Sequence, residues 1–358
     1  MFDYKNIRNI FFKLDPEQAH CIAEMAMRTC TALPVVSSFI AQKACINAPE
    51  LMQSLLGAMY PNPVMMAGGF DKNATMLRPL AALGFGGLEF GTFTKKAQDG
   101  NPKPRLFRLI KEESIQNSMG FNNKGASEIY KNVKPLYPFV LPIWANIGKN
   151  KLTPNENAID DYLSLVSKFN PICDAFVINL SSPNTPNLRE LLSFDFISEL
   201  FSRLNGLSTR PVFLKISPDM SNQSAVELCK HAVNLGAAGV IVANTSTDYS
   251  LSSSPNLKDF GGLSGKVIAA RAKELLKDVA SELYSKCVIV ASGGISSADE
   301  AYERIKFGAS LVQVFSAFIY EGPFLARRIN EGLCELLAKD GYAHISEAVG
   351  ALIRKNDA

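Results

Sequence analysis

The sequence has few of the residues that would indicate a metal centre or a secreted protein. It contains only 3 His in 358 residues. None of these lies at ligand spacing from another His or a Cys, so we expect no zinc or iron site. The 7 Cys are an odd number, with no C-x-x-C pair and no secretory leader before them. This pattern predicts free thiols in a reducing, cytosolic compartment.

A strong charge of either sign is also missing. There are 37 Lys and Arg against 34 Asp and Glu, and the net charge is +3. Because the basic residues do not cluster, we expect no nucleic-acid partner. The long uncharged run over residues 51–70 is broken by Pro61 and Pro63, so it does not predict a membrane span. A hydrophobic content of 47% is that of an ordinary soluble enzyme.

Residues 1–45 are predicted to form a helical extension that precedes a larger domain over residues 46–358. Between Lys5 and Leu14 the apolar residues recur at helical spacing among basic ones, which predicts a short amphipathic helix. Asp15 and Pro16 predict the start of a second helix, and a third follows before Lys43. These helices either pack on the main domain or lie on a membrane surface.

Short apolar runs alternate with segments of helical periodicity eight times after residue 62. The predicted strands are 64–67, 87–91, 143–147, 175–180, 212–216, 239–243, 288–291 and 311–314. The predicted helices are 74–83, 125–133, 158–169, 194–204, 223–235, 266–283, 297–307 and 323–338. Eight such repeats predict an α/β fold, a (β/α)8 TIM barrel with its site at the carboxyl ends of the strands.

Polar residues follow every predicted strand. A single Asn or Lys at such a position is more often part of a turn, but here Lys72 and Lys215 follow two strands and amide side chains follow three others. The Gly293-Gly294 pair and Ser316 stand where such barrels bind phosphate groups. Since no G-x-G-x-x-G follows a strand, a dinucleotide site is not predicted.

Ten segments at these strand ends together resemble the dihydroorotate dehydrogenase family. In chain order they are AGGFDKN (67–73), GFGGLEFGTFT (84–94), KPRLFRL (103–109), QNSMGFNNKG (116–125), NIGKNK (146–151), INLSSPNTPNLR (178–189), KISPD (215–219), NTS (244–246), GGLSGK (261–266) and ASGGIS (291–296). The resemblance covers about residues 5–350. Ser182, where soluble class 1 members usually carry cysteine, and FFKLDPEQAH (11–20) resemble the membrane-associated, quinone-reducing class 2.

The resemblance implies a function and a location. It implies an FMN-dependent oxidoreductase that oxidises dihydroorotate to orotate in pyrimidine biosynthesis and passes the electrons to ubiquinone or menaquinone. It also implies peripheral contact with the membrane, at the cytoplasmic face of the cell membrane.

The resemblance assigns roles to individual residues. Ser182 would be the catalytic base, with Thr185 or an ordered water as its proton relay. The residues implied for substrate binding are Lys72, Asn117, Ser118, Met119, Gly120, Phe121, Asn179, Asn184, Asn244 and Thr245. Those implied for FMN are Gly68, Gly69, Lys72, Thr92, Asn146, Asn179, Lys215, Gly265, Gly294, Phe315 and Ser316. His20 and Arg108 match polar residues of the family's quinone channel, although a core histidine and a solvated arginine are ordinary alternatives.

Two positions depart from the family's pattern. Phe315 replaces a frequent tyrosine, which removes one hydrogen bond to a quinone, and Ala243 replaces a frequent threonine. Two other functions stay open. One is a phosphate-binding lyase or aldolase with Lys215 as a Schiff base. The other is a membrane-recruited flavin-binding module without catalytic activity.

Overall fold

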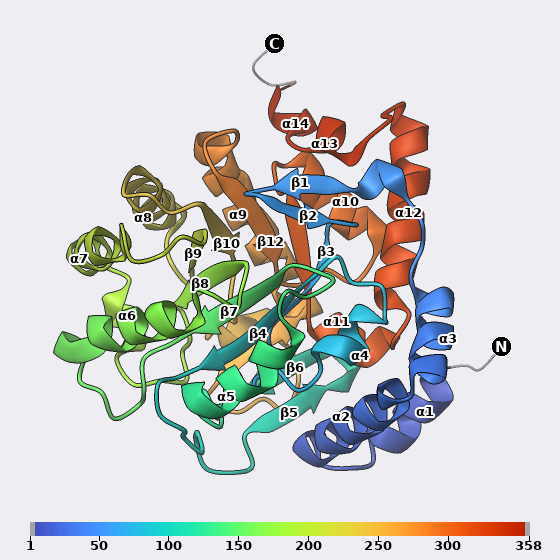
Figure 1. Ribbon diagram of the computed structural model, residues 1–358, viewed down its shortest axis with the longest axis horizontal. Helices are drawn as coiled ribbons and strands as arrows, with labels where there is room; N and C mark the ends of the chain where they lie inside the picture. The colour runs from blue at the N-terminus through green and yellow to red at the C-terminus, as the bar shows by residue number, and fades with distance from the viewer. Residues whose placement is uncertain (1–3, 355–358) are drawn as a thin grey trace.

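The computed structural model describes residues 4–354 and is built around a closed barrel of eight parallel strands (Figure 1). Around the barrel the order is β10, β12, β13, β3, β4, β7, β8 and β9. The bounds are β3 Val64–Asp71, β4 Gly87–Phe93, β7 Ile143–Ile147, β8 Ala175–Asn179, β9 Val212–Lys215, β10 Gly239–Val242, β12 Val288–Ser292 and β13 Leu311–Val314. This confirms the predicted (β/α)8 barrel, and each of the eight predicted strands overlaps one of these.

Helices cover the outside of the barrel, as predicted. They are α4 Leu77–Ala81, α5 Ala126–Val133, α6 Ala158–Phe169, α7 Phe194–Leu204, α8 Asn222–Asn234, α9 Ala269–Leu283, α10 Ala298–Lys306 and α12 Leu325–Asp340, with short helices α11 Ser316–Glu321, α13 Ile345–Ala348 and α14 Ala351–Arg354. The helix predicted over 74–83 is wrong at its start. Ala74 has a left-handed φ of 53°, and the Asp71 carboxylate accepts the N–H groups of Thr75 and Met76.

The side chains inside the barrel form two layers. The lower layer is apolar and includes Met65, Trp144, Val177, Phe213, Ile241, Val290 and Leu311. Because alternate residues of a strand face the same side, the residues two places after Trp144, Val177, Phe213 and Leu311 also point inward. These residues are Asn146, Asn179, Lys215 and Gln313, all buried. A polar layer therefore lies on an apolar floor, on the side of the carboxyl ends.

Two small antiparallel sheets were not predicted. β5 (Leu106–Leu109), β6 (Ser114–Asn117) and β11 (Gly262–Gly265) form a three-stranded sheet beside the carboxyl ends. β1 (Gln53–Leu55) and β2 (Ala58–Tyr60) form a hairpin whose Tyr60 hydroxyl accepts a 2.8 Å hydrogen bond from the Trp144 indole. These strands have three or four residues each and mix polar with apolar side chains, so no continuous apolar run marks them.

Three helices precede the barrel, as predicted: α1 Tyr4–Phe11, α2 Pro16–Ala32 and α3 Pro34–Ala44. Asp15 caps α2 by accepting the N–H groups of Glu17 and Gln18. The three helices lie beside α11, α12 and β5, so the first and last parts of the chain meet (Figure 1). No helix within residues 4–354 has the length and hydrophobicity needed to cross a membrane.

Hydrogen bonds and ion pairs attach these helices to the barrel. The Tyr4 hydroxyl donates to the Ile319 carbonyl of α11 at 2.8 Å, in the helix that follows β13. Glu17 of α2 forms a 3.0 Å ion pair with Arg105, and the Thr75 hydroxyl donates to Glu24 at 2.6 Å. The helices therefore pack on the main domain, as one of the two sequence interpretations expected.

Candidate active site

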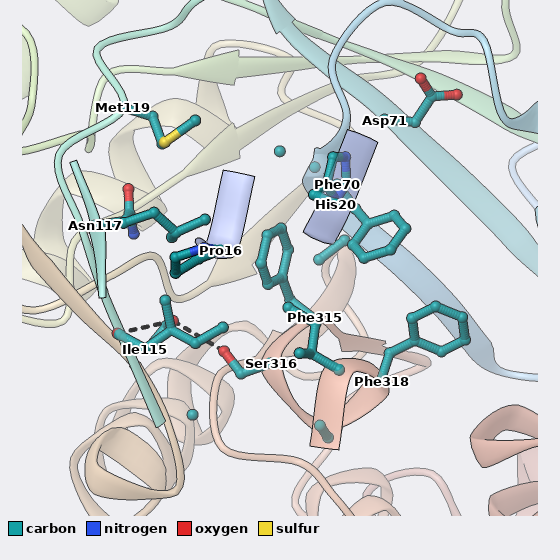
Figure 2. A pocket seen from close by; sticks show the side chains of 18 of the residues that line it. Pro16, His20, Phe70, Asp71, Ile115, Asn117, Met119, Phe315, Ser316 and Phe318 are labelled. Carbon is teal, nitrogen blue, oxygen red and sulfur yellow. Dashed lines mark hydrogen bonds between the residues drawn. The ribbon is translucent and has the colours of Figure 1, made fainter. Parts of the chain in front are cut away.

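A cavity of about 600 Å³ lies at the carboxyl ends of the barrel strands and continues beneath α1 and α2. Figure 2 shows Asn117 and Met119 on one side of this cavity and His20, Phe70, Phe315 and Phe318 on the other. The polar strand ends and the N-terminal helices thus line the same space.

The structure brings nearly all of the predicted site residues to this cavity. Its lining includes Ser182, Lys72, Asn117, Met119, Gly120, Phe121, Asn179, Asn184, Asn244, Thr245, Gly68, Gly69, Thr92, Lys215, Gly265, Gly294, Phe315, Ser316, His20 and Arg108. Three predicted residues are outside the lining: Asn146, in the polar layer below, Ser118, whose hydroxyl accepts a 3.2 Å hydrogen bond from Asn101, and Thr185, the predicted proton relay. The roles assigned to these residues stay predictions.

A chain of hydrogen bonds crosses the polar layer from β4 to β10. The Thr92 hydroxyl donates to Asn146 Oδ1 at 2.6 Å and accepts from Asn179 Nδ2 at 2.8 Å. Asn244 Nδ2 then donates to Asn179 Oδ1 at 3.2 Å and to the Ser181 hydroxyl at 2.8 Å. Four strand ends are therefore held in one fixed arrangement of donors and acceptors.

A buried ion pair lies in the same layer. Lys215 Nζ is 3.3 Å from Glu89 Oε1, and both side chains are almost fully buried. Glu89 also accepts hydrogen bonds from the side-chain amides of Asn146 and Gln313. The sequence interpretation missed Glu89 and Gln313. A signal was present, because a charged residue inside an otherwise apolar buried strand requires a partner.

Lys72 follows β3 and faces the cavity. Burial, with a smaller contribution from the nearby Arg105, lowers the pKa of its ammonium group to about 8, although Glu17 and Asp71 oppose the effect. A cation that is poorly solvated in a cavity has a strong attraction for an anionic ligand. Lys72 is therefore a candidate partner for a carboxylate.

Ser182 lies in the loop after β8 and is almost fully buried. Its hydroxyl oxygen accepts a 3.3 Å hydrogen bond from the Asn184 backbone N–H, and Asn184 Nδ2 donates to Asn117 Oδ1 at 3.2 Å. The hydroxyl of Thr185 is buried and has no hydrogen-bond partner among the described residues. The loop thus places one hydroxyl at the cavity and holds a second, unpaired hydroxyl three residues further on.

Arg189 fixes this loop to the neighbouring strand ends. Its guanidinium donates to the Ser181 carbonyl and to the Thr245 carbonyl, each at 3.0 Å, and it pairs with Asp219 at 2.7 Å. One side chain therefore connects the loops after β8, β9 and β10.

Glycines bring backbone close together at the far end of the cavity. Gly294 has a φ of 73°, and a Cβ there would lie 2.4 Å from Ala269 Cα. A Cβ on Gly265 would lie 2.7 Å from the Glu113 carbonyl oxygen. The Ser316 hydroxyl is 2.9 Å from that of Ser264. This end therefore presents backbone and hydroxyl groups, the kind of surface that binds phosphate groups.

Aromatic side chains line the side of the cavity next to the N-terminal helices. The His20 ring is 5.1 Å from that of Phe70, which in turn contacts Phe315 at 5.7 Å and Phe318 at 5.3 Å (Figure 2). Burial, together with the charge of Lys72, lowers the pKa of His20 to about 4. His20 is therefore neutral at physiological pH and suits an apolar passage.

Arg108, in β5, holds the end of α1 and is not a freely solvated arginine. Its guanidinium donates to the Leu14 carbonyl at 2.8 Å and to the Phe12 carbonyl at 3.4 Å. It also lies over the Phe12 ring at 4.7 Å. These contacts fix the segment that closes the apolar side of the cavity.

The barrel and this cavity define a class of protein. Basic, amide and hydroxyl groups converge at the carboxyl ends of eight parallel strands, which is where (β/α)8 enzymes carry their active sites. Comparison with known proteins gives the family. The family model "Dihydroorotate dehydrogenase" matches residues 50–337. The chain therefore belongs to the dihydroorotate dehydrogenase family of oxidoreductases.

Relatives match nearly the whole chain. A protein of a Nitratiruptor species, named dihydroorotate dehydrogenase (quinone), is 53% identical over 98% of this chain and 100% of its own. One of the same name from a Sulfurovum species is 49% identical over 98% of each chain. A solved structure is also similar, the crystal structure of DHODH from Eimeria tenella in complex with ferulenol. Its sequence is 32% identical, and the two structures superpose with a TM-score of 0.82 over 94% of this chain and 95% of that chain.

Proposed function

We propose that this protein oxidises dihydroorotate to orotate, with FMN as the hydride acceptor and a membrane quinone as the final electron acceptor. One observation carries the proposal: a single cavity joins the polar strand ends to the apolar passage under α1 and α2. A soluble anion and a lipid-soluble quinone need different surroundings, and this cavity offers both. The family membership and the relatives named as quinone-linked dehydrogenases support the same function.

For the substrate, we propose that Lys72 binds the carboxylate and that the strand-end amides bind the ring. Asn117, Asn184 and Asn244 all line the cavity and offer both donors and acceptors. Ser182 removes the proton from C5 of dihydroorotate, and the Thr185 hydroxyl, which has no partner among the described residues, would pass that proton on. A serine is a weak base, so such a relay is needed for the reaction.

The cavity fits FMN in size and in chemistry. Its volume of about 600 Å³ is in the range of cofactor and ligand sites. A buried oxygen of Gln313 has no partner among the described residues and would accept from a ring N–H, while the backbone around Gly294 and Gly265 would hold the phosphate. When bound, FMN supplies the hydride acceptor, and the charge of Lys215 would stabilise the negative charge gained on reduction.

For the quinone, we propose access from the membrane between α1 and α2. The described helices α1 to α3 carry a set of exposed apolar side chains, which would lie at the lipid interface of the cytoplasmic face. These are Ile10, Ile22, Met25, Val35 and Phe39, together with Leu33 between α2 and α3. The extension over residues 1–45 would thus serve the second half-reaction, with Phe315 offering the quinone a ring contact and no hydroxyl.

The two alternative functions have less support. A Schiff-base lysine must present a free amine, whereas Lys215 Nζ is held 3.3 Å from the Glu89 carboxylate. A flavin-binding module without activity would not explain why the relatives are dehydrogenases.

The proposal is tested by the two half-reactions of the purified full-length protein. Anaerobic mixing with dihydroorotate should bleach the flavin absorbance, and a long-chain quinone should restore it faster than NAD⁺ does. Mass spectrometry of the released chromophore should give FMN. A colourless protein that takes up no flavin, or a flavin that dihydroorotate does not bleach, would refute the proposal.

A further inference from the structure

Glu89 stands out because it is a fully buried carboxylate that the proposed chemistry does not use. It lies in β4, every residue of which is buried, and its side chain is 0% exposed. An unpaired charge at such a position is strongly destabilising. The contacts of Glu89 therefore show why a carboxylate is kept there.

Three side chains from three different strands converge on this carboxylate. Lys215 of β9 lies 3.3 Å from Oε1, the Asn146 amide of β7 donates to the same oxygen, and the Gln313 amide of β13 donates to Oε2. The backbone of β3 closes the fourth side, because a Cβ on Gly68 would lie 2.2 Å from Oε1. Glu89 thus contacts four of the seven other strands.

The carboxylate fixes the orientation of the Asn146 amide. A carboxylate only accepts hydrogen bonds, so Asn146 must turn its NH₂ group toward Glu89 and its oxygen away. That oxygen then accepts from the Thr92 hydroxyl at 2.6 Å, which leaves the Thr92 oxygen to accept from Asn179 at 2.8 Å. Glu89 therefore sets the direction of the hydrogen bonds as far as Asn179, at the cavity.

The same argument applies to Gln313. Its NH₂ group is used by Glu89, so its oxygen is turned away from the carboxylate. That oxygen is buried and has no partner among the described residues, and Gln313 lines the cavity. An unpaired buried acceptor is costly, which points to an N–H donor on a bound ligand.

We propose that Glu89 is a positioning residue of the flavin site: its carboxylate orients Asn146 and Gln313 and offsets part of the Lys215 charge. The inference rests on the proposed flavin-dependent function. It predicts two separable effects on bound FMN. The negative charge of Glu89 disfavours the reduced, anionic form of the cofactor, and the fixed amide orientation strengthens its binding.

Glu89→Gln tests the charge. This variant has the same shape but leaves Lys215 without its counter-ion, so reduced FMN should be stabilised relative to oxidised FMN by about tenfold, a midpoint potential about 30 mV more positive. Its NH₂ group also competes with the two amides, so the Kd for FMN should rise about three- to tenfold. Both are measured by spectroelectrochemistry and by FMN titration of the apoprotein.

Glu89→Asp and Gln313→Leu test the orientation. Glu89→Asp keeps the charge, but its shorter side chain moves the carboxylate away from the amides of Asn146 and Gln313. FMN binding should therefore weaken, while the midpoint potential stays at the wild-type value. Gln313→Leu removes the unpaired acceptor and should also weaken FMN binding about three- to tenfold. If Glu89→Gln does not fold, as judged by circular dichroism, these two variants carry the test.

Asp161→Asn is the matched control. Asp161 is also buried and accepts from the Asn150 N–H and the Thr153 hydroxyl, but it does not line the cavity. Its variant should leave the potential and the Kd for FMN unchanged. Folded Glu89 and Gln313 variants with wild-type potential and FMN affinity would overturn the inference. Failure of the wild type to bind FMN would instead refute the proposed function.

Discussion

The guanidinium of Arg108 lies over the ring of Phe12, 4.7 Å from its centre, and so joins β5 to the end of α1. The same group donates to the Leu14 carbonyl at 2.8 Å. Since α1 lines the apolar side of the cavity, this contact belongs to the passage proposed for the quinone and lies apart from the strand ends proposed for the substrate.

Arg108→Ala should therefore separate the two half-reactions. We expect reoxidation of the flavin by a long-chain quinone to slow at least tenfold, because a charge-assisted hydrogen bond and a cation–π contact to the turn after α1 are lost together. Bleaching by dihydroorotate should stay within about twofold, as is usual for a side chain outside the reacting centre. Lys111→Ala, at an exposed residue three positions further along the chain, is the control. Equal slowing of both rates would contradict the assignment.

Ser182→Ala tests the base. Loss of a general base typically costs 10²- to 10⁴-fold, so bleaching of the flavin by dihydroorotate should slow by about that factor in stopped-flow experiments. Orotate should still bind, because Lys72 and the amides are unchanged. Ser182→Cys should keep some activity with its pH profile moved to lower pH, since a thiol ionises more readily than a hydroxyl. Ser182→Ala bleaching at a rate within a few-fold of wild type would rule out this role.

The lowered pKa of Lys72 predicts how the binding of an anionic ligand depends on pH. The pKa of Lys72 is lowered to about 8, so its charge is present below that pH and is lost above it. We expect the Kd of orotate to be constant near pH 7 and to rise about tenfold by pH 9. Lys72→Gln should bind weakly at both pH values without this rise. A wild-type Kd that stays flat to pH 9 would show that Lys72 does not hold the anion.

The raised pKa of Asp71 predicts that the stability of the fold depends on pH. Burial raises the pKa of its carboxyl to about 6, so the folded state favours the protonated form. The stabilisation is fully present below the pKa of the unfolded chain, near 4, and is lost as the pH rises through about 6. The difference in the free energy of unfolding between the wild type and Asp71→Asn should change by up to about 3 kcal/mol between pH 4 and 7, with the wild type losing stability as the pH rises. A difference independent of pH would contradict this.

The apolar surface of the N-terminal helices predicts binding to lipid vesicles. Val35 is 83% exposed and Phe39 is 60% exposed, and both belong to α3. Replacing both by Glu should weaken co-sedimentation with anionic vesicles about tenfold or more, because each apolar side chain contributes about 1.5 kcal/mol or more when buried. Val140→Glu with Leu152→Glu is the control, since these residues of the barrel loops are 82% and 93% exposed. Equal losses in both pairs would contradict a specific membrane face.

The barrel could be predicted from the sequence because its strands are continuous apolar runs closed by Gly, Pro or Asn. The sheet of β5, β6 and β11 could not, because LFRL, SIQN and GLSG carry no such run and pair with segments distant in sequence. The helix predicted from residue 74 failed at its start for a local reason. Ala74 has a left-handed φ of 53°, and the Asp71 carboxylate accepts the N–H groups of Thr75 and Met76, so the chain turns here before α4 begins at Leu77.

Most of the candidate site could be predicted because its residues directly follow the strands. The family resemblance supplied their roles, whereas the spacing supplied only their common location. Glu89 was missed because it lies inside the strand predicted over 87–91, three residues before Thr92, the first residue considered at the end of that strand. Its partners Lys215 and Gln313 come from strands more than a hundred residues away, so only the closed barrel shows that the three side chains meet.

The bond between Tyr4 and Ile319 has a consequence for how the chain is made. Synthesis begins at the amino terminus, so α1 leaves the ribosome long before its binding site on α11 exists. The hydrogen bond from Arg8 of α1 to the Tyr320 carbonyl can likewise form only after this late part of the chain has been made. For most of translation the first amphipathic helix therefore has no barrel surface to cover, and its apolar face stays exposed until the last strand of the barrel has been made.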